Sequence, residues 1–208
     1  MRAHNDFIVH IPQKYKDSIE TKKGTKIYVD SRFSSKDAAE NIFEVVNIPV
    51  NYNGSIRKGS LLLVDPILVH NQRFEKWGTE QNQYLVDREK KLYKVPPSLV
   101  ICYAPKNGSN FKGFNDNLIC QKREIEKTNK ERKIGSIIIP DMSVENNKDT
   151  SVLQVVISNE KLKQEENVFK DDLIYYKPFG AIDIMINSKK YIWLKNNYVL
   201  AKYLKSAS

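Results

Sequence analysis

Short apolar runs bounded by Gly, Pro, Asn and Asp recur along the whole chain. They are rich in β-branched and aromatic residues, which is typical of strands. No segment keeps a convincing helical period, and the best helical candidate, residues 35–41, is short. We therefore predict an all-β barrel or sandwich. The predicted strands are Phe7–Ile11, Asn41–Val46, Leu61–Val64, Leu92–Val95, Leu99–Tyr103, Leu118–Lys122, Val152–Ile157, Leu173–Tyr176, Ile182–Ile186, Tyr191–Leu194 and Tyr198–Tyr203.

Two long polar stretches interrupt this pattern, from about residue 13 to 40 and from about residue 123 to 150. Loops of this length inside a compact domain are usually functional or disordered. Each stretch contains a single apolar island, Ile27-Tyr28-Val29 in the first and Ile137-Ile138-Ile139 in the second. Gly135 precedes the second island and permits a sharp turn of the backbone, and Pro140 follows it. The islands are therefore candidates for insertion into a groove on a partner, although a buried strand remains the simpler interpretation of each.

The two halves of the chain align with each other, which indicates an internal duplication. The segment Ala104–Asn110, rich in Gly, Pro, Ser and Asn, lies near the midpoint and predicts the boundary. We expect one domain over residues 1–104, a linker over 105–113 and a second domain over 114–208. A shift of about 110 residues places Ile8 on Leu118, Gly24–Asp30 on Gly135–Asp141, Val45-Val46 on Val155-Val156, and Lys90–Val100 on Lys189–Val199.

The net charge of +9 raises the question of nucleic-acid binding. The lysines are dispersed, however, and interleaved with glutamates, as in residues 122–127. This arrangement favours a solvated surface over a basic stripe. The apolar runs are much shorter than the roughly 20 residues of a membrane-spanning helix, and we expect neither such a helix nor a signal peptide.

Cysteine and histidine usage argues against cofactor or metal chemistry. Cys102 and Cys120 lie in separate predicted strands, which excludes a disulfide scaffold and fits a reducing compartment. The three histidines, His4, His10 and His70, lack acidic partners at motif spacing, so we predict no metal site. The glycines are scattered singly, without a phosphate-binding loop. We therefore expect no cofactor and no catalytic residues, and thus not an enzyme.

Other polar and aromatic candidates have ordinary explanations. Asp171-Asp172 is explained by a tight turn. Tyr175-Tyr176 and Trp193 are expected to pack in the barrel or between subunits, with base stacking as the alternative.

The order of elements in the second half resembles the GroES family of co-chaperonins. The resemblance covers most of Asn115–Tyr203, and Asp6–Tyr103 more loosely. The segments that carry it are Asp116–Lys122, similar to the family's first strand; Gly135–Pro140, similar to its mobile-loop motif; Leu153–Val156; Val168–Tyr176; and the closing pair Tyr191–Leu194 with Tyr198–Ala201.

The resemblance implies two tandem GroES-like, partly open β-barrels and a homo-oligomeric ring that caps a GroEL-type chaperonin, the partner that binds ATP. It also implies the contact residues: Gly135 and Ile137–Ile139 in the second half, with Ile27, Tyr28 and Val29 as a second, weaker loop. A cytoplasmic or organellar location follows, without a membrane partner.

Two other functions remain open on the sequence alone. One is a structural ring or shell protein that uses the same barrel without a chaperonin. The other is a nucleic-acid-binding β-barrel, whose affinity would depend steeply on salt.

Overall fold

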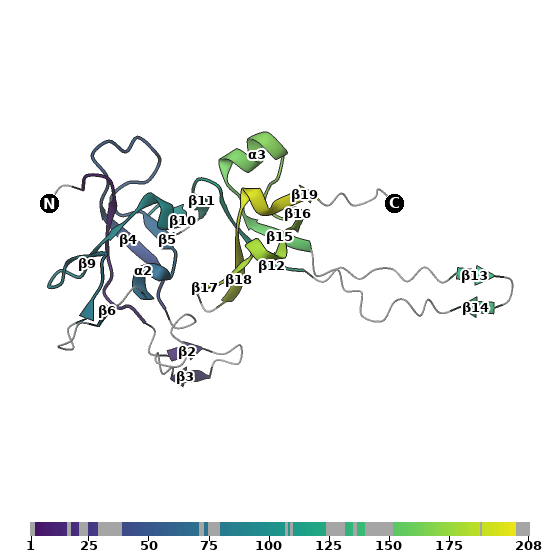
Figure 1. Ribbon diagram of the computed structural model, residues 1–208, viewed down its shortest axis with the longest axis horizontal. Coiled ribbons are helices and arrows are strands. Elements are labelled where there is room, and N and C mark those ends of the chain that lie inside the picture. The colour runs from purple at the N-terminus through teal and green to yellow at the C-terminus, as the bar shows by residue number, and fades with distance from the viewer. Residues whose placement is uncertain are drawn as a thin grey trace.

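The computed structural model contains two large antiparallel sheets that lie side by side (Figure 1). The described residues are 3–15, 18–20, 25–28, 39–70, 73–74, 80–106, 108, 110–123, 132–134, 137–139, 152–187 and 189–202. We call the seven-stranded sheet with its core the first unit and the six-stranded sheet with its core the second unit. The prediction of an all-β fold with two partly open barrels is confirmed.

Each predicted strand is present, within one or two residues at either end in most cases. The strands of the first sheet are β1 (Phe7–His10), β4 (Ile42–Asn47), β5 (Leu61–Val64), β8 (Leu85–Asp87), β9 (Leu92–Val95), β10 (Val100–Ala104) and β11 (Lys112–Gly113). Those of the second are β12 (Asn117–Lys122), β15 (Val152–Ile157), β16 (Leu173–Tyr176), β17 (Ile182–Ile186), β18 (Lys189–Lys195) and β19 (Val199–Lys202).

Three two-stranded sheets and several short helices complete the described elements. The small sheets pair β2 (Ser18–Glu20) with β3 (Lys26–Tyr28), β6 (Arg73–Phe74) with β7 (Glu80–Gln81), and β13 (Arg132–Ile134) with β14 (Ile137–Ile139). The helices are α2 (Ile67–His70) and α3 (Glu160–Glu166), with 3-10 turns η1 (Pro97–Leu99), η3 (Pro178–Gly180) and η4 (Asn196–Tyr198).

The short helical candidate over residues 35–41 is not a helix in its described residues, 39–41. Residues 35–38 lie outside the described part, and Ala39 forms an isolated β-bridge with Tyr15. Helix α3 was not predicted, because it is too short and too charged to show a period. Its signal is local: the Asn159 side chain accepts a hydrogen bond from the Leu162 backbone N–H, and Leu162 is buried.

The second sheet repeats the strand order of the first. The order β8-β9-β1-β4-β5-β10 corresponds to β17-β18-β12-β15-β16-β19. A register shift occurs after Ile8 where β1 pairs with β4, and after Ile119 where β12 pairs with β15. Ile8 therefore takes the place of Ile119, and the predicted match of Ile8 with Leu118 is wrong by one residue. Both strands are runs of apolar residues, so the sequence alone could not distinguish the two registers. The difference matters because a slip of one residue exchanges the two faces of a strand.

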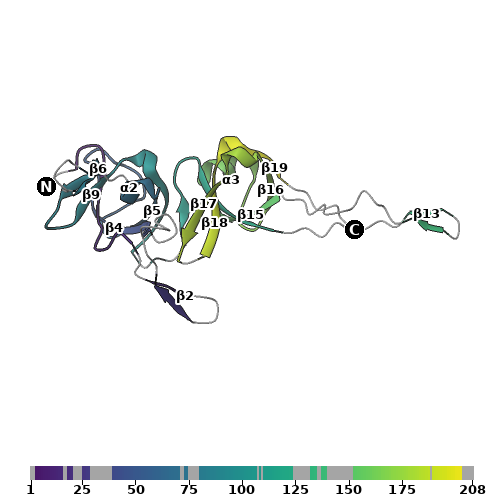
Figure 2. The same ribbon diagram turned by 60° about the horizontal axis from the view of Figure 1, so that its bottom comes forward.

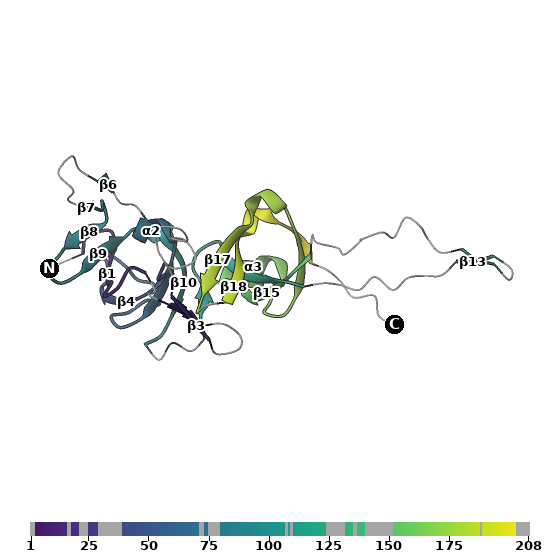
Figure 3. The same cartoon turned by 90° about the horizontal axis from the view of Figure 1, so that it is seen from below.

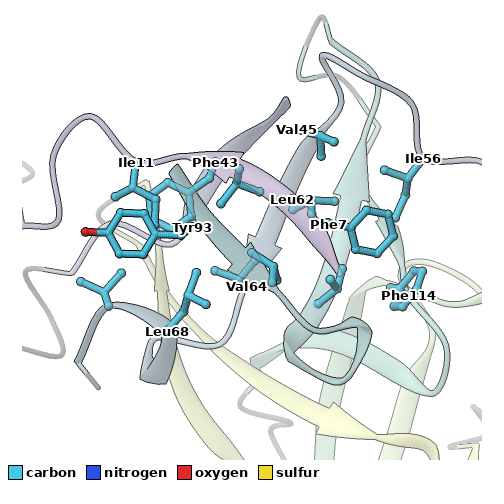
Figure 4. Close-up of a cluster of buried hydrophobic side chains, with 14 residues drawn as sticks. Phe7, Ile11, Phe43, Val45, Ile56, Leu62, Val64, Leu68, Tyr93 and Phe114 are labelled. Carbon is cyan, nitrogen blue, oxygen red and sulfur yellow. The ribbon is translucent and has the colours of Figure 1, made fainter. Parts of the chain in front are cut away.

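Among the described residues, three clusters of buried apolar side chains stabilise the fold. One fills the first unit, where Phe7 and Phe114 lie with ring centroids 6.4 Å apart (Figure 4). A second, built around Leu118 and Leu153, fills the second unit. The third lies between the units and joins Leu63 of the first sheet to Trp193 of the second. Figure 2 shows β17 and β18 on the side of the second sheet that faces the first.

Asn117 connects the two units through hydrogen bonds. Its buried side-chain amide donates to the backbone oxygens of Val100, at 3.0 Å, and Phe114, at 2.9 Å. Its Oδ1 accepts a hydrogen bond from Trp193 Nε1 at 2.9 Å. Within the predicted linker, β11 pairs with β10 of the first sheet. The described part of this segment is therefore built into the fold.

The same tight turn leads into β5 and β16. The backbone N–H of Gly59 donates to Val45 O, and the N–H of Asp171 donates to Val155 O, both at 2.8 Å. Both turn residues have positive φ, +83° for Gly59 and +71° for Asp171. Asp172 Oδ2 accepts from the Phe169 backbone N–H at 2.8 Å, which confirms that the turn explains this carboxylate pair.

Asp171→Gly should raise the free energy of unfolding by about 0.5–1 kcal/mol, because a left-handed conformation strains any residue that has a Cβ. The reverse substitution, Gly59→Asp, should lower it by a similar or larger amount. Urea denaturation of both variants measures the two effects. The Asp171 side chain accepts a hydrogen bond from Gln154 Nε2 at 3.2 Å. A loss of stability in Asp171→Gly would mean that this side chain stabilises the fold by more free energy than the backbone strain costs.

Candidate functional site

The second apolar island forms one strand of a hairpin that stands apart from both large sheets. β14 pairs antiparallel with β13, and Ile134 faces Ile137 in the register. Gly135 and Ser136 alone separate these strands in the sequence. A two-residue connection that begins with Gly is typical of a tight hairpin, so the sequence contained a hairpin signal that was missed. Gly135 itself lies outside the described residues.

The hairpin β13–β14 lies far beyond the body of the second unit in every view (Figures 1 and 3). Its place in the chain, between β12 and β15, corresponds to that of β2–β3 between β1 and β4. The backbone of Ile137, Ile138 and Ile139 is therefore held in paired strand geometry at a distance from the two main sheets.

The first apolar island forms a matching hairpin. β3 pairs with β2, with Ile27 opposite Ile19 and Tyr28 opposite Ser18. The Tyr28 side chain is 82% exposed, so it is available for contact. Val29 lies outside the described residues. The two hairpins occupy equivalent places in the chain, but this one presents a tyrosine where the other has Ile139.

The two cysteines are buried free thiols in β10 and β12. Burial raises the pKa of both thiols, because the thiolate is disfavoured away from water. A thiol held in this protonated, inaccessible state is a poor nucleophile. Their role in the fold is to pack, Cys102 between the units and Cys120 within the second core.

A thiol reagent should therefore label neither cysteine at neutral pH until the protein unfolds. The expected result is slow labelling of both thiols in buffer and complete, rapid labelling in denaturant. Mass spectrometry counts the labels on the chain. Rapid labelling of one thiol in buffer would show local opening around that strand.

The remaining polar candidates do not assemble into a reactive site. His4 and His10 are exposed. Within the part of the chain that the structure describes, no three His, Cys, Asp or Glu side chains gather closely enough to hold a metal ion. The same described residues contain no helix long and apolar enough to cross a membrane.

A hollow of about 190 Å³ in the first unit is lined by Lys14, Asn82, Leu85, Arg88 and Tyr93. The buried side-chain amide of Asn82 already has hydrogen-bond partners within the protein. It donates to Leu68 O and accepts from the Tyr84 N–H.

Two aromatic side chains considered for base stacking are buried. Tyr176 packs in the core of the second unit, and Trp193 packs between the units. The prediction that Trp193 packs rather than stacks is confirmed, although its partner is the other unit of the same chain. An exposed ring face is needed to stack on a base, so neither residue provides one.

Comparison with known proteins connects the second unit to a family. No curated protein matches the chain at a significant level. Residues 110–203 match the model of the chaperonin 10 (Cpn10) family, described as the Chaperonin 10 Kd subunit. This range runs from β11 through the hairpin β13–β14 to β19. The second unit of the chain is thus similar to the Cpn10 family.

Proposed function

We propose that the chain is a co-chaperonin that caps a GroEL-type chaperonin and assists protein folding, with two Cpn10-like domains in tandem. The domains comprise residues 1–104 and 114–208, joined by residues 105–113. The observation that carries the proposal is the Cpn10 match over residues 110–203, because that match includes the isolated hairpin β13–β14. The repeated strand order of the two sheets supports a second domain of the same kind.

The contact is made by Ile137, Ile138 and Ile139 of β14, which insert into an apolar groove of the chaperonin. Burying one isoleucine contributes about 1.5–3 kcal/mol. Ordering a loop residue costs on the order of 1–2 kcal/mol. Pairing of β13 with β14 supports the proposal, because a backbone already paired in the unbound chain has less entropy to lose on binding. Ile27, Tyr28 and Val29 form the second, weaker contact.

Several hairpins must act together for a stable lid. Each contact alone is weak, since the gain from apolar burial is offset by the cost of ordering the loop. Barrels arranged in a ring present several hairpins at once and raise the effective concentration of each. The chaperonin binds and hydrolyses the ATP, and this chain contributes contacts rather than catalysis. It acts where its chaperonin is, in the cytoplasm or in an organelle.

A refolding assay tests this function. A denatured client that aggregates without a lid is diluted into a bacterial GroEL-type chaperonin and ATP, with and without this chain. We expect a higher yield of active client when the chain is present, and no gain when ATP is omitted. A yield equal to that of the chaperonin alone would refute the proposal. If the chain still assembled into rings, a structural role for the barrels would then replace it.

A further inference from the structure

The hollow in the first unit is formed by two parts of the chain that are distant in the sequence. Lys14 follows β1, whereas Asn82, Leu85, Arg88 and Tyr93 belong to the β8–β9 hairpin or to the residues just before it. The volume of the hollow, about 190 Å³, is below the roughly 300–1,000 Å³ of pockets that enclose drug-sized ligands. It therefore suits a small chemical group rather than a whole cofactor.

The described residues that line the hollow include two cations and no acidic side chain. Lys14 and Arg88 carry the positive charges. Asp87 and Glu89, the acids next to Arg88 in the sequence, are not among the lining residues. Asp87 is instead engaged by Lys90, whose backbone N–H donates to Asp87 Oδ1 at 2.9 Å and whose Nζ lies 3.9 Å from Asp87 Oδ2. The charge distribution of the hollow therefore favours an anion.

Both cations stand on backbone that is already hydrogen-bonded. Lys14 O accepts from the Glu40 N–H at 2.9 Å, and Arg88 O accepts from the Lys91 N–H at 3.3 Å. The Lys14 ammonium group also lies over the Tyr93 ring, with Nζ 5.8 Å from the ring centroid, which is a favourable cation–π arrangement. A site whose groups are held in place before binding loses less entropy when the ligand arrives.

The wall of the hollow is fixed as well. Tyr93 is 5% exposed and lies in the core of the first unit, with its hydroxyl group directed away from the other labelled side chains (Figure 4). Asn82 is buried, and its side chain donates to Leu68 O at 2.9 Å and accepts from the Tyr84 N–H at 2.8 Å. Asn82 therefore keeps the wall in shape and leaves ligand binding to the two cations.

The second unit has a different chemistry at the equivalent positions. The register of the sheets places Ile192 at the position of Tyr93 and Asp183 at the position of Leu85. The aromatic ring is thus replaced by an aliphatic side chain, and an apolar wall residue by a carboxylate that repels anions. The features that favour an anion therefore belong to the first unit.

We propose that this hollow binds a phosphate-type oxyanion between the Lys14 ammonium group and the Arg88 guanidinium group. The planar guanidinium group donates to two oxygens of a phosphate at once, and the ammonium group acts as a point charge. A phosphate dianion balances both cations, whereas a single carboxylate balances only one. The phosphate is either free or the terminal group of a nucleotide whose remaining atoms lie outside the hollow. The proposal does not depend on the co-chaperonin function.

Titration of the isotope-labelled chain with sodium phosphate tests the proposal by NMR. Phosphate replaces chloride at constant ionic strength, so that the screening of surface charges does not change. We expect saturable shifts of the backbone amides of Asn82, Leu85, Arg88 and Tyr93. A parallel titration with ADP distinguishes the two sources of phosphate. An affinity for ADP no higher than that for phosphate indicates a free anion, and tighter binding of ADP with shifts of the same amides indicates a nucleotide.

Substitution of the two cations locates the site. Lys14→Gln and Arg88→Gln should each weaken phosphate binding by about tenfold or more, because a charge-assisted hydrogen bond is worth at least the free energy of a tenfold change in affinity. Lys58→Gln is the matched control, since Lys58 is an exposed lysine of the first unit that does not line the hollow. It should bind phosphate like the wild type. Circular dichroism checks that each variant remains folded.

Three results would overturn the proposal. One is the absence of saturable shifts with both phosphate and ADP. Another is an affinity that neither Lys14→Gln nor Arg88→Gln lowers. The third is an equal loss of affinity in Lys58→Gln, which would indicate binding to surface charge in general. Because no chaperonin is present, each of these results leaves the proposed co-chaperonin function to its own test.

Discussion

Ile138→Glu should abolish the binding of this chain to a chaperonin while leaving its fold intact. Glutamate removes the apolar burial of one isoleucine, which contributes about 1.5–3 kcal/mol, and would place a carboxylate in an apolar groove. The affinity of each hairpin should fall by at least tenfold, since 1.4 kcal/mol corresponds to a factor of ten. Loss at several hairpins of a ring multiplies the effect. A pull-down with immobilised chaperonin in ATP or ADP measures the retained fraction.

The matched substitutions separate the two hairpins and exclude a general effect of charge. Tyr28→Glu makes the same kind of change in β3, and it should weaken binding less because this contact is the weaker one. Val50→Glu adds a carboxylate at an exposed apolar position that belongs to neither hairpin and should have no effect. Circular dichroism checks that each variant remains folded. Retention of Ile138→Glu at the wild-type level would remove β14 from the contact.

Trp193→Ala should lower the free energy of unfolding by about 3–5 kcal/mol, as is usual for a buried aromatic side chain. Trp193 packs between the units and donates its Nε1–H to Asn117 Oδ1. Removing the indole leaves a cavity at the junction and a buried acceptor without this donor, which costs about a further 1–3 kcal/mol if water does not replace it. Urea denaturation followed by circular dichroism measures the change.

Phe179→Ala is the matched control for this loss, because it truncates an aromatic side chain that is 80% exposed. Its effect should stay within about 0.5 kcal/mol. A second observable distinguishes the junction from the core of one unit. If Trp193 couples the two units, its removal should separate their unfolding into two transitions. A small loss of stability with a single unfolding transition would contradict the claim that Trp193 couples the two units.

The strands were predictable because they are short apolar runs punctuated by turn residues. β5, β9 and β16 begin and end where the sequence predicted. The register was less predictable, since a run such as Leu118–Cys120 can present either face, and only its pairing with β15 and β18 decides. Helix α3 was missed because its evidence is one cap and one buried leucine rather than a period.

An apolar island within a polar stretch indicated the candidate site, but the hairpin was not predicted. Three consecutive isoleucines in β14 were visible, whereas the partner strand Arg132–Ile134 contains two basic residues and was not identified as a strand. The junction between the units was not predictable residue by residue. Whether a residue such as Trp193 packs within a barrel or between two of them depends on long-range contacts that no local pattern records.

The most direct test of the central claim is sedimentation of the wild-type chain with a bacterial GroEL-type chaperonin, compared with and without nucleotide. The chain is present in excess, so that binding by its two hairpins is detectable even without a complete ring. We expect the chain to co-sediment with the chaperonin in ATP or ADP and to remain unbound when nucleotide is omitted. A chain that stays in the unbound fraction under every nucleotide condition would contradict it.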